Sequence, residues 1–474
     1  MIWTDRDGFL DIIKDQTHYG IFLDMGTGKT SLLLALIDYK MLFTTHIKKV
    51  LIIAPKQVSL STWQNEMRKF KNFNYMLDYI DLINGDENER NAILKKTKEN
   101  CIHIISSSQV AWLYGKKVRK KYKTRKGEEK ERTETIINKL RPDYDLIIVD
   151  ECSQFKDVRT ARFKALEKIA KDKELFLLSG TPFSNIRYES KITTDGRVYE
   201  FYKKADELFY LFRLLRLYDG SLTDFRNEFC YSNPWTPNLY YMHPAVYEEM
   251  ITWLHEKSIT KTLELDVDLI NHIVECDTDK ERMKELINTY EIETKGFEEI
   301  SASNRAVMIN KSLQLSNGFA YDAMNNPIRF NDFKFQKMLE VINTIPDRNI
   351  IIFYSFVEDK EYILKNLKGS KEYEGEQDMK DWNDGKIKYL VLSPFGGKYG
   401  LNLQFGGNTI FWYGLVWSSE AVSQSNARAY RKGQTKNVDV YYFLSNYGFD
   451  RYVYDVVVSK IKTINDFKAY IQDM

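Results

Sequence analysis

The chain has 474 residues, enough for two to four domains at roughly 100–200 residues each. Hydrophobic residues make up 43% of it and charged residues 29%, the mixture of an ordinary soluble globular protein. No apolar run approaches the roughly 18 residues that span a bilayer, and no basic stretch leads into an apolar one at the start. We therefore expect neither a membrane protein nor a signal peptide.

The net charge of +2, from 69 basic and 67 acidic residues, does not by itself indicate nucleic-acid binding. The four cysteines lie far apart without a Cys-x-x-Cys pair, and the six histidines are scattered. A structural zinc site or a disulfide framework is therefore not expected, and the composition fits a reducing cytoplasm.

Short apolar runs rich in Ile, Val and Leu alternate with helical stretches in the first part of the chain, as is typical of buried strands in a parallel sheet. These runs are Tyr19–Met25, Val50–Pro55, Ile102–Ser106, Leu146–Asp150 and Leu175–Ser179. Between them, Ser31–Leu42 and Ala161–Ala170 are expected as crossover helices.

A second set of apolar runs lies in the last third of the chain, at Asn349–Phe356, Tyr389–Ser393, Thr409–Trp412 and Val438–Leu444. Between the two sets the strand pattern stops, and Ala205–Tyr218 and Asp279–Gly318 have helical spacing. The sequence therefore predicts an α/β protein with a lobe at 1–185, a helical insertion and linker at 186–330, and a second lobe at 331–474.

A glycine-rich segment, Gly26-Thr27-Gly28-Lys29-Thr30, joins the first predicted strand to a helix. Glycine lets backbone N–H groups approach phosphates, and a helix N-terminus adds a positive dipole end. We therefore expect Lys29 to reach the β- and γ-phosphates of a nucleotide and Thr30 to ligate Mg²⁺. The strict pattern has glycine at position 23, where this chain has Leu23. The alternative is a turn that binds no ligand.

Two carboxylates, Asp150 and Glu151, end the predicted strand Leu146–Asp150. We expect Asp150 to hold Mg²⁺, directly or through water, and Glu151 to polarise the attacking water. An acidic pair at a strand end is common and is weak evidence by itself. It indicates a nucleotide site because the glycine-rich segment precedes it in the chain.

Three polar residues in the second lobe, Gln424, Arg428 and Arg431, are further catalytic candidates. The spacing of the two arginines predicts that they lie on one helix face. A cleft between two lobes needs cations from the opposite lobe to neutralise charge growing on the γ-phosphate. Taken in isolation, the arginines would usually be surface residues.

Together these motifs resemble the Swi/Snf-like branch of superfamily-two helicases and translocases, in the compact form found in bacteriophages and bacteria. The resemblance covers nearly the whole chain. Its first-lobe motifs are Asp24–Thr30, Ala54–Lys56 followed by Trp63, Asp150–Ser153 and Ser179–Asn185. Its second-lobe motifs are Ile351–Ser355, Gly400–Leu403 and Gln424–Gln434.

The resemblance implies two RecA-like lobes with nucleic acid across their tops. ATP with Mg²⁺ closes the interlobe cleft, hydrolysis opens it, and the protein steps along one strand, mostly of duplex DNA. Gly400 is expected to join the nucleotide site. A role in phage or bacterial replication, recombination or defence, in the bacterial cytoplasm, fits this family.

The chain departs from the family pattern in four places. No family-type glutamine precedes the glycine-rich segment, Cys152-Ser153 replaces Ala-His, and Tyr430 replaces the usual His. Lys398 stands where glycine is common, which could add a phosphate contact. None of these changes removes a catalytic group.

Tracking a phosphate backbone needs hydroxyl groups, backbone N–H groups and basic side chains that do not distinguish bases. The candidates at strand ends are Lys56, Ser107, Ser108, Ser184, Ser393, Lys398 and Asn402. Each could instead cap a loop or form a turn. Trp63 could stack on a base, although core packing is the commoner role of such a residue.

Eight of the eleven residues between Lys116 and Lys126 are Lys or Arg, among them Lys120 and Lys123. We expect this crowded segment to form a protruding hairpin that grips the DNA backbone. The alternative is a solvated charged loop.

The sequence leaves two other functions open. An RNA helicase would share the motifs, but Gln434 and the insertion after Asn185 favour the Swi/Snf branch. A nucleotide-gated DNA clamp without turnover is less compatible with the retention of Lys29, Glu151 and Arg431.

Overall fold

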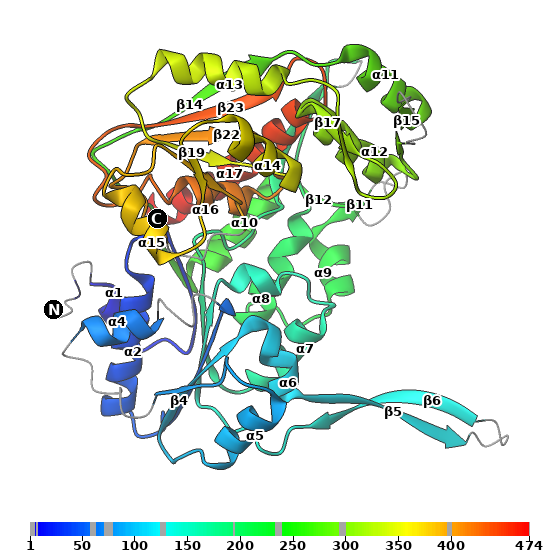
Figure 1. Cartoon of the computed structure of the whole chain (residues 1–474). Helices are drawn as coiled ribbons and strands as arrows, with labels where there is room; N and C mark the ends of the chain where they lie inside the picture. The colour runs from blue at the N-terminus through cyan, green and yellow to red at the C-terminus, as the bar shows by residue number, and fades with distance from the viewer. Residues whose placement is uncertain are drawn as a thin grey trace. The chain divides into compact units, whose positions relative to one another are not determined.

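A computed structural model describes residues 5, 8–56, 63–70, 79–123, 129–192, 195–232, 239–292, 300–395 and 401–473. The chain folds into two compact units (Figure 1). Unit 1 consists of Met1–Leu263 and Thr463–Met474, and unit 2 consists of Glu264–Lys462.

Unit 1 is built on a seven-stranded parallel sheet with the strand order β13-β1-β8-β7-β2-β4-β3. Its central strands are buried along almost their whole length, because helices cover both faces of such a sheet. The five predicted strands are confirmed, and β3 and β13 join them. The strands are β1 (His18–Leu23), β2 (Lys49–Ala54), β3 (Tyr79–Asp81), β4 (Cys101–Ser106), β7 (Leu146–Asp150), β8 (Glu174–Leu178) and β13 (Ser258–Lys261).

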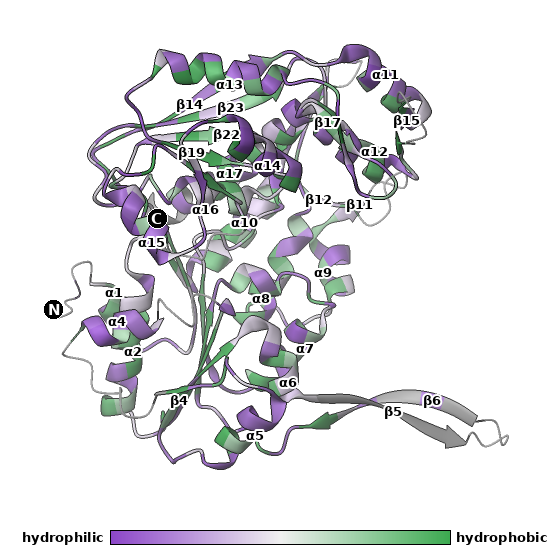
Figure 2. Cartoon of the chain, viewed as in Figure 1, coloured by the Kyte–Doolittle hydropathy of each residue, from purple (hydrophilic) through white to green (hydrophobic). Residues whose placement is uncertain are grey.

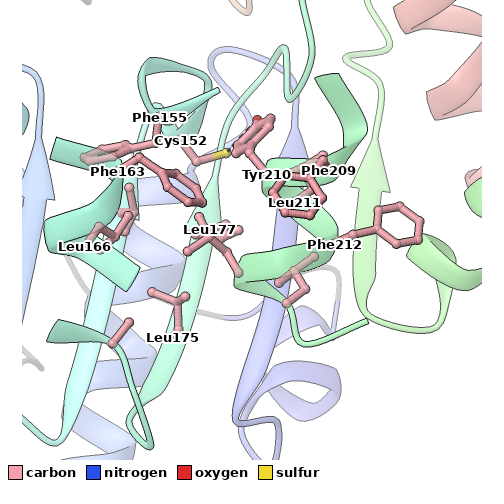
Figure 3. Packing of buried hydrophobic residues seen from close by; sticks show 14 of the residues in the cluster. Cys152, Phe155, Phe163, Leu166, Leu175, Leu177, Phe209, Tyr210, Leu211 and Phe212 are labelled. Atoms are coloured by element: carbon pink, nitrogen blue, oxygen red, sulfur yellow. Dashed lines mark hydrogen bonds between the residues drawn. The ribbon is translucent and has the colours of Figure 1, made fainter. Parts of the chain in front are cut away.

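The helices of unit 1 include both predicted crossovers, α2 (Lys29–Phe43) and α7 (Ala161–Ile169). Figure 3 shows Phe163 and Leu166 of α7 packed near Leu177 of β8. The other helices among the described residues are α1 (Phe9–Ile13), α4 (Gln64–Lys69), α5 (Glu87–Lys95), α6 (Val110–Tyr114), α8 (Phe209–Leu214), α9 (Leu222–Phe229) and α10 (Pro244–His255). The described part of unit 1 also contains the short 3₁₀ turns η3 (Ser107–Gln109), η4 (Cys152–Phe155) and η5 (Ala205–Leu208).

A long two-stranded ribbon, β5 (Gly115–Lys123) with β6 (Glu129–Ile137), extends away from the sheet of unit 1 (Figure 1). The prediction of a protruding hairpin at this basic segment is therefore confirmed.

Unit 2 is built on a six-stranded parallel sheet with the order β14-β23-β22-β19-β21-β20. The four predicted strands are present, together with β14 and β20. The strands are β14 (Leu269–Cys276), β19 (Ile350–Phe353), β20 (Ser370–Glu372), β21 (Tyr389–Leu392), β22 (Thr409–Trp412) and β23 (Val438–Ser445). Two small hairpins are β15 (Glu291–Ile292) with β16 (Ile300–Ser301), and β17 (Phe319–Tyr321) with β18 (Pro327–Arg329).

The helices around this sheet are α11 (Lys280–Thr289), α12 (Arg305–Ser316), α13 (Phe333–Thr344), α14 (Val357–Asn366), α15 (Glu376–Asn383), α16 (Ser419–Asn426) and α17 (Asp450–Asp473). Hydrophilic residues dominate α11 in Figure 2, as its charged sequence requires. Helix α17 belongs to unit 2 up to Lys462 and to unit 1 from Thr463. The predicted α/β class, with two parallel sheets, is confirmed.

The prediction that strands stop between 186 and 330 was wrong. An antiparallel sheet lies there, in the order β11-β12-β10-β9, and the same region supplies β13 to unit 1 and β14 to unit 2. Its strands are β9 (Arg187–Ile192), β10 (Val198–Lys203), β11 (Tyr231–Ser232) and β12 (Tyr240–Met242). Strand β9 is charged and largely exposed, so it lacks the buried apolar run that identifies the other strands.

Candidate nucleotide and nucleic-acid sites

The glycine-rich segment forms a tight loop between β1 and α2. Gly26 and Gly28 have φ values of 82° and 87°, a left-handed conformation that glycine adopts without steric cost. Helix α2 begins at Lys29, whose Nζ donates to the carbonyl oxygens of Leu23 at 2.8 Å and Asp24 at 3.0 Å. Thr27 Oγ1 donates to the Asp24 carbonyl at 2.7 Å. The predicted strand–loop–helix arrangement is therefore present, with Leu23 as the last residue of the strand.

The acidic pair lies at the end of β7, and both carboxylates are buried. Asp150 Oδ2 accepts a hydrogen bond from Trp63 Nε1 at 3.0 Å, and Asp150 Oδ1 accepts one from the Glu151 N–H at 3.0 Å. Ser179 Oγ donates to Glu151 Oε2 at 3.3 Å. Trp63 is fully buried, so its core-packing role is confirmed and base stacking is not available to it.

Neighbouring strands bring these motifs to one edge of the sheet. The order β1-β8-β7 places the glycine loop, Ser179-Gly180 and the acidic pair after adjacent strands. A Cβ built on Gly180 would lie 3.9 Å from Lys29 Nζ. Burial lowers the pKa of Lys29, and the negative charges of Glu151 and Asp150 oppose that shift. The cation and the two carboxylates therefore form one electrostatic unit.

Thr30 and Asp150 offer the hydroxyl and carboxylate oxygens that suit Mg²⁺. Among the residues that the structure describes, no group of three or more His, Cys, Asp and Glu could hold a metal by itself. Mg²⁺ commonly takes one or two carboxylates from the protein and completes its shell with water and substrate phosphates. The donor set therefore fits a magnesium ion that arrives with a nucleotide.

Replacing Trp63 with Phe should shift the pH dependence of this site. Burial raises the pKa of Asp150, and the Trp63 hydrogen bond counteracts that rise by stabilising the carboxylate. Without the donor the pKa should rise further, so the acid limb of kcat/KM for Mg-ATP should move to higher pH, by about one unit for a hydrogen bond to a charged group. An unchanged acid limb in a folded variant would contradict this role for Trp63.

The two candidate arginines of unit 2 do not share a helix face, so that prediction was wrong. Helix α16 contains Gln424 but ends at Asn426, and the arginines lie in the turns that follow. Arg428 is buried, with its guanidinium 5.6 Å from the centre of the Phe353 ring. Arg431 Nη1 donates to the Leu401 carbonyl at 3.1 Å, and burial lowers the pKa of Arg431.

The arginine turn packs directly on the segment after residue 400. The Leu403 N–H donates to the Arg428 carbonyl at 3.0 Å, and Gln434 Nε2 donates to the Gln404 carbonyl at 3.0 Å. Two motifs that are distant in sequence therefore form one polar cluster within unit 2. Gly400, like Lys398, lies outside the described residues.

The candidate phosphate contacts divide by exposure. Lys56, Ser108 and Asn402 are exposed, and Ser393 is partly exposed. Ser107 is buried and its hydroxyl donates to Gln154, while buried Ser184 accepts a hydrogen bond from Lys156 Nζ. The loop-capping alternative therefore describes Ser107 and Ser184 better than contact with a ligand.

The strand register of the hairpin places some basic positions of β5 opposite acidic positions of β6. Strand β5 carries six basic residues, and β6 carries three acidic and two basic ones. Lys121 is paired with Glu131 and Lys123 with Glu129, whereas Lys116 faces Ile136 and Lys120 faces Arg132. By composition, the two strands together carry eight basic and three acidic residues, so the hairpin has a positive excess.

Comparisons with known proteins agree with the motifs. Residues 9–234 match the family model of the SNF2-related domain. The chain is 25% identical over 431 residues to putative protein p41 of Acyrthosiphon pisum secondary endosymbiont phage 1, an alignment that covers 87% of this chain and 85% of that protein. It is 23% identical over 361 residues to the uncharacterized ATP-dependent helicase YqhH of Bacillus subtilis (strain 168), covering 70% of this chain and 61% of that protein.

Among solved structures, the chain is similar to the Sulfolobus solfataricus SWI2/SNF2 ATPase core in complex with dsDNA. The TM-score is 0.39 at 18% sequence identity, and the match covers 98% of this chain and 92% of that one. In the part of the chain that the structure describes, helices are too short or too polar to span a membrane.

Residues 9–234 are thus similar to SNF2-related domains. The resemblance to Swi/Snf-like superfamily-two proteins, which the motifs predicted, is confirmed.

Proposed function

We propose that this protein is a DNA-dependent ATPase that uses ATP and Mg²⁺ to translocate along DNA, with duplex DNA as the preferred track. The observation that carries the proposal is the joint placement of Lys29, Asp150 and Glu151 at one sheet edge of a region similar to SNF2-related domains. A phosphate-binding cation beside two buried carboxylates is the arrangement that nucleotide hydrolysis needs.

The residues of unit 1 have separate roles in this proposal. Loop N–H groups and Lys29 bind the phosphates, and Thr30 with Asp150 holds Mg²⁺, which when bound neutralises phosphate charge. Glu151 accepts a hydrogen bond from Ser179 and orients the attacking water. In this proposal Arg428 and Arg431 neutralise charge on the γ-phosphate, and Gln424 is a further catalytic candidate.

The nucleic-acid track is proposed from the same edge of the first sheet. Strands β2 and β4 follow β7 in the strand order, and the exposed residues Lys56 and Ser108 each lie two positions after the end of one of these strands. Parallel strands present their carboxyl ends together, so a backbone-binding row can lie next to the nucleotide site. Ser393 and Asn402 are the corresponding candidates of unit 2.

A role in phage or bacterial DNA replication or recombination, in the host cytoplasm, is part of this proposal and is supported by the similarity to a phage protein over most of both chains. Measuring ATP hydrolysis with duplex DNA, single-stranded DNA, RNA and no nucleic acid tests it. Stimulation by RNA alone would favour an RNA helicase, and tight DNA binding without turnover would favour a clamp.

The hairpin should contribute to DNA affinity through charge. If three of its basic residues contact phosphates, replacing Lys116–Lys123 with Ser and Gly should flatten the log–log salt slope of the binding constant by about three units. ATP turnover at saturating DNA should survive. Replacing Glu129 and Glu131 with Gln is the matched control, and it should steepen the slope. Equal slopes in all three proteins would identify the hairpin as a solvated element.

A further inference from the structure

Asp24, the first residue after β1, forms several hydrogen bonds and an ion pair within unit 1. Its N–H donates to the Lys261 carbonyl at 3.0 Å, and its carbonyl oxygen accepts hydrogen bonds from Thr27 and Lys29. Asp24 Oδ2 accepts from the Leu263 N–H at 2.8 Å. Asp24 Oδ1 forms an ion pair with Lys468 Nζ. Asp24 is therefore bonded both to the phosphate loop and to residues 261, 263 and 468.

Lys468 is a buried lysine, with 3% of its side chain exposed, whereas Asp24 is 31% exposed. Lys468 lies near the end of α17, far in the sequence from every motif described above. Phe467 beside it packs on Phe183, with ring centres 4.9 Å apart, and the Lys468 carbonyl accepts a hydrogen bond from Thr260 Oγ1 at 3.1 Å. Burying an ammonium group is costly unless an anion compensates it, so this placement requires the Asp24 carboxylate.

The Asp24–Lys468 ion pair affects how the loop binds an anionic ligand. Asp24 adjoins a loop whose proposed ligand is a highly charged phosphate anion, and an uncompensated carboxylate there would repel it. Lys468 removes that repulsion. It also acts on Lys29 as a second positive charge, lowering the pKa of Lys29 in addition to the effect of burial.

We infer that Lys468 is a positioning residue of the phosphate loop: it neutralises Asp24, fixes the entry into the loop and thereby sustains nucleotide affinity. The inference rests on the proposed function, because it takes the loop at Asp24–Thr30 to be the nucleotide site. Because α17 begins in unit 2, the contact also joins the phosphate loop to a helix that both units share.

The test compares four variants of the full chain with the wild type: Lys468→Met, Lys468→Arg, Asp24→Asn with Lys468→Met, and Lys462→Met. Lys462 is an exposed lysine of the same helix and serves as the control. The readouts are the Kd for Mg-ATP, KM and kcat, and the thermal unfolding midpoint. Methionine is unbranched like lysine and one heavy atom shorter, so it removes the charge and keeps most of the side-chain volume at position 468.

Lys468→Met should weaken Mg-ATP binding about tenfold, as expected for one uncompensated charge close to a charged ligand. The loss should fall on KM more than on kcat. The double variant should regain most of the affinity, since it lacks the uncompensated carboxylate, and Lys468→Arg and Lys462→Met should bind like the wild type.

A purely structural ion pair gives a different pattern, because the single and double variants both lose it. Equal affinities of Lys468→Met and the double variant, or wild-type affinity of Lys468→Met, would overturn the inference while leaving the proposed function intact. A wild-type protein that binds no Mg-ATP would overturn the proposed function itself.

Discussion

Replacing Lys29 with alanine should abolish ATP turnover and weaken nucleotide binding. The side chain supplies the cation of the loop, and the structure holds it against the carbonyl oxygens of Leu23 and Asp24. Replacing Glu151 with glutamine should also abolish turnover, because the amide cannot polarise water, but it should spare nucleotide binding. Comparing the two variants separates nucleotide binding from the hydrolysis step. An ATPase assay measures turnover, and a titration with Mg-ATP measures binding.

The Glu151→Gln protein should also remain bound to DNA in the presence of ATP, since the nucleotide persists uncleaved. A suitable control is Glu99→Gln, which changes an exposed glutamate that pairs with Lys48. The control should hydrolyse ATP like the wild type. Near wild-type turnover in either folded site variant would refute the assignment of the nucleotide site.

Replacing Arg431 with alanine should remove most DNA-stimulated ATP hydrolysis while changing nucleotide affinity little. An arginine that stabilises the transferring phosphoryl group is worth roughly a thousandfold or more in turnover in related enzymes. Arg431 is only partly buried, and among the described residues its guanidinium donates to the Leu401 carbonyl oxygen, which uses one of its five N–H donors. Arg428→Ala should also be severe. Arg348, which pairs with Asp439, offers a control in the same unit.

Retention of more than about a third of the wild-type rate by Arg431→Ala would refute the proposed role of unit 2, since the expected loss is near a thousandfold. Thermal unfolding of the variant should accompany the assay, because Arg431 also bonds the Leu401 carbonyl.

The central strands were predictable because each is a short, fully apolar run, as in Leu146–Asp150, and burial of both sheet faces demands that composition. The glycine loop was equally predictable, since its conformation requires glycine at positions 26 and 28. Strand β9 was missed because its exposed faces tolerate charge, and β14 because Asn271 and His272 interrupt its apolar run.

The contacts that support the site could not be predicted from the sequence, because they join residues that are far apart in the chain and meet only in the folded protein. Trp63 bonds Asp150 across 87 positions, and Lys468 pairs with Asp24 across 444. The motif that includes Trp63 does not reveal that Asp150 is its partner, and Lys468 carries no local signal, since a lone Lys is common in a helix. The arginine turn was misassigned because a spacing of three residues fits both a helix and the turns after one.

The measurement that tests the central claim most directly is the ATPase rate of the wild-type chain with increasing duplex DNA. Single-stranded DNA, RNA and no nucleic acid are run in parallel, and Lys29→Ala is the blank. We expect a low basal rate that rises severalfold and saturates with duplex DNA, and no activity in the blank. A rate that no nucleic acid changes, or one that Lys29→Ala retains, would contradict a DNA-dependent ATPase built on this site.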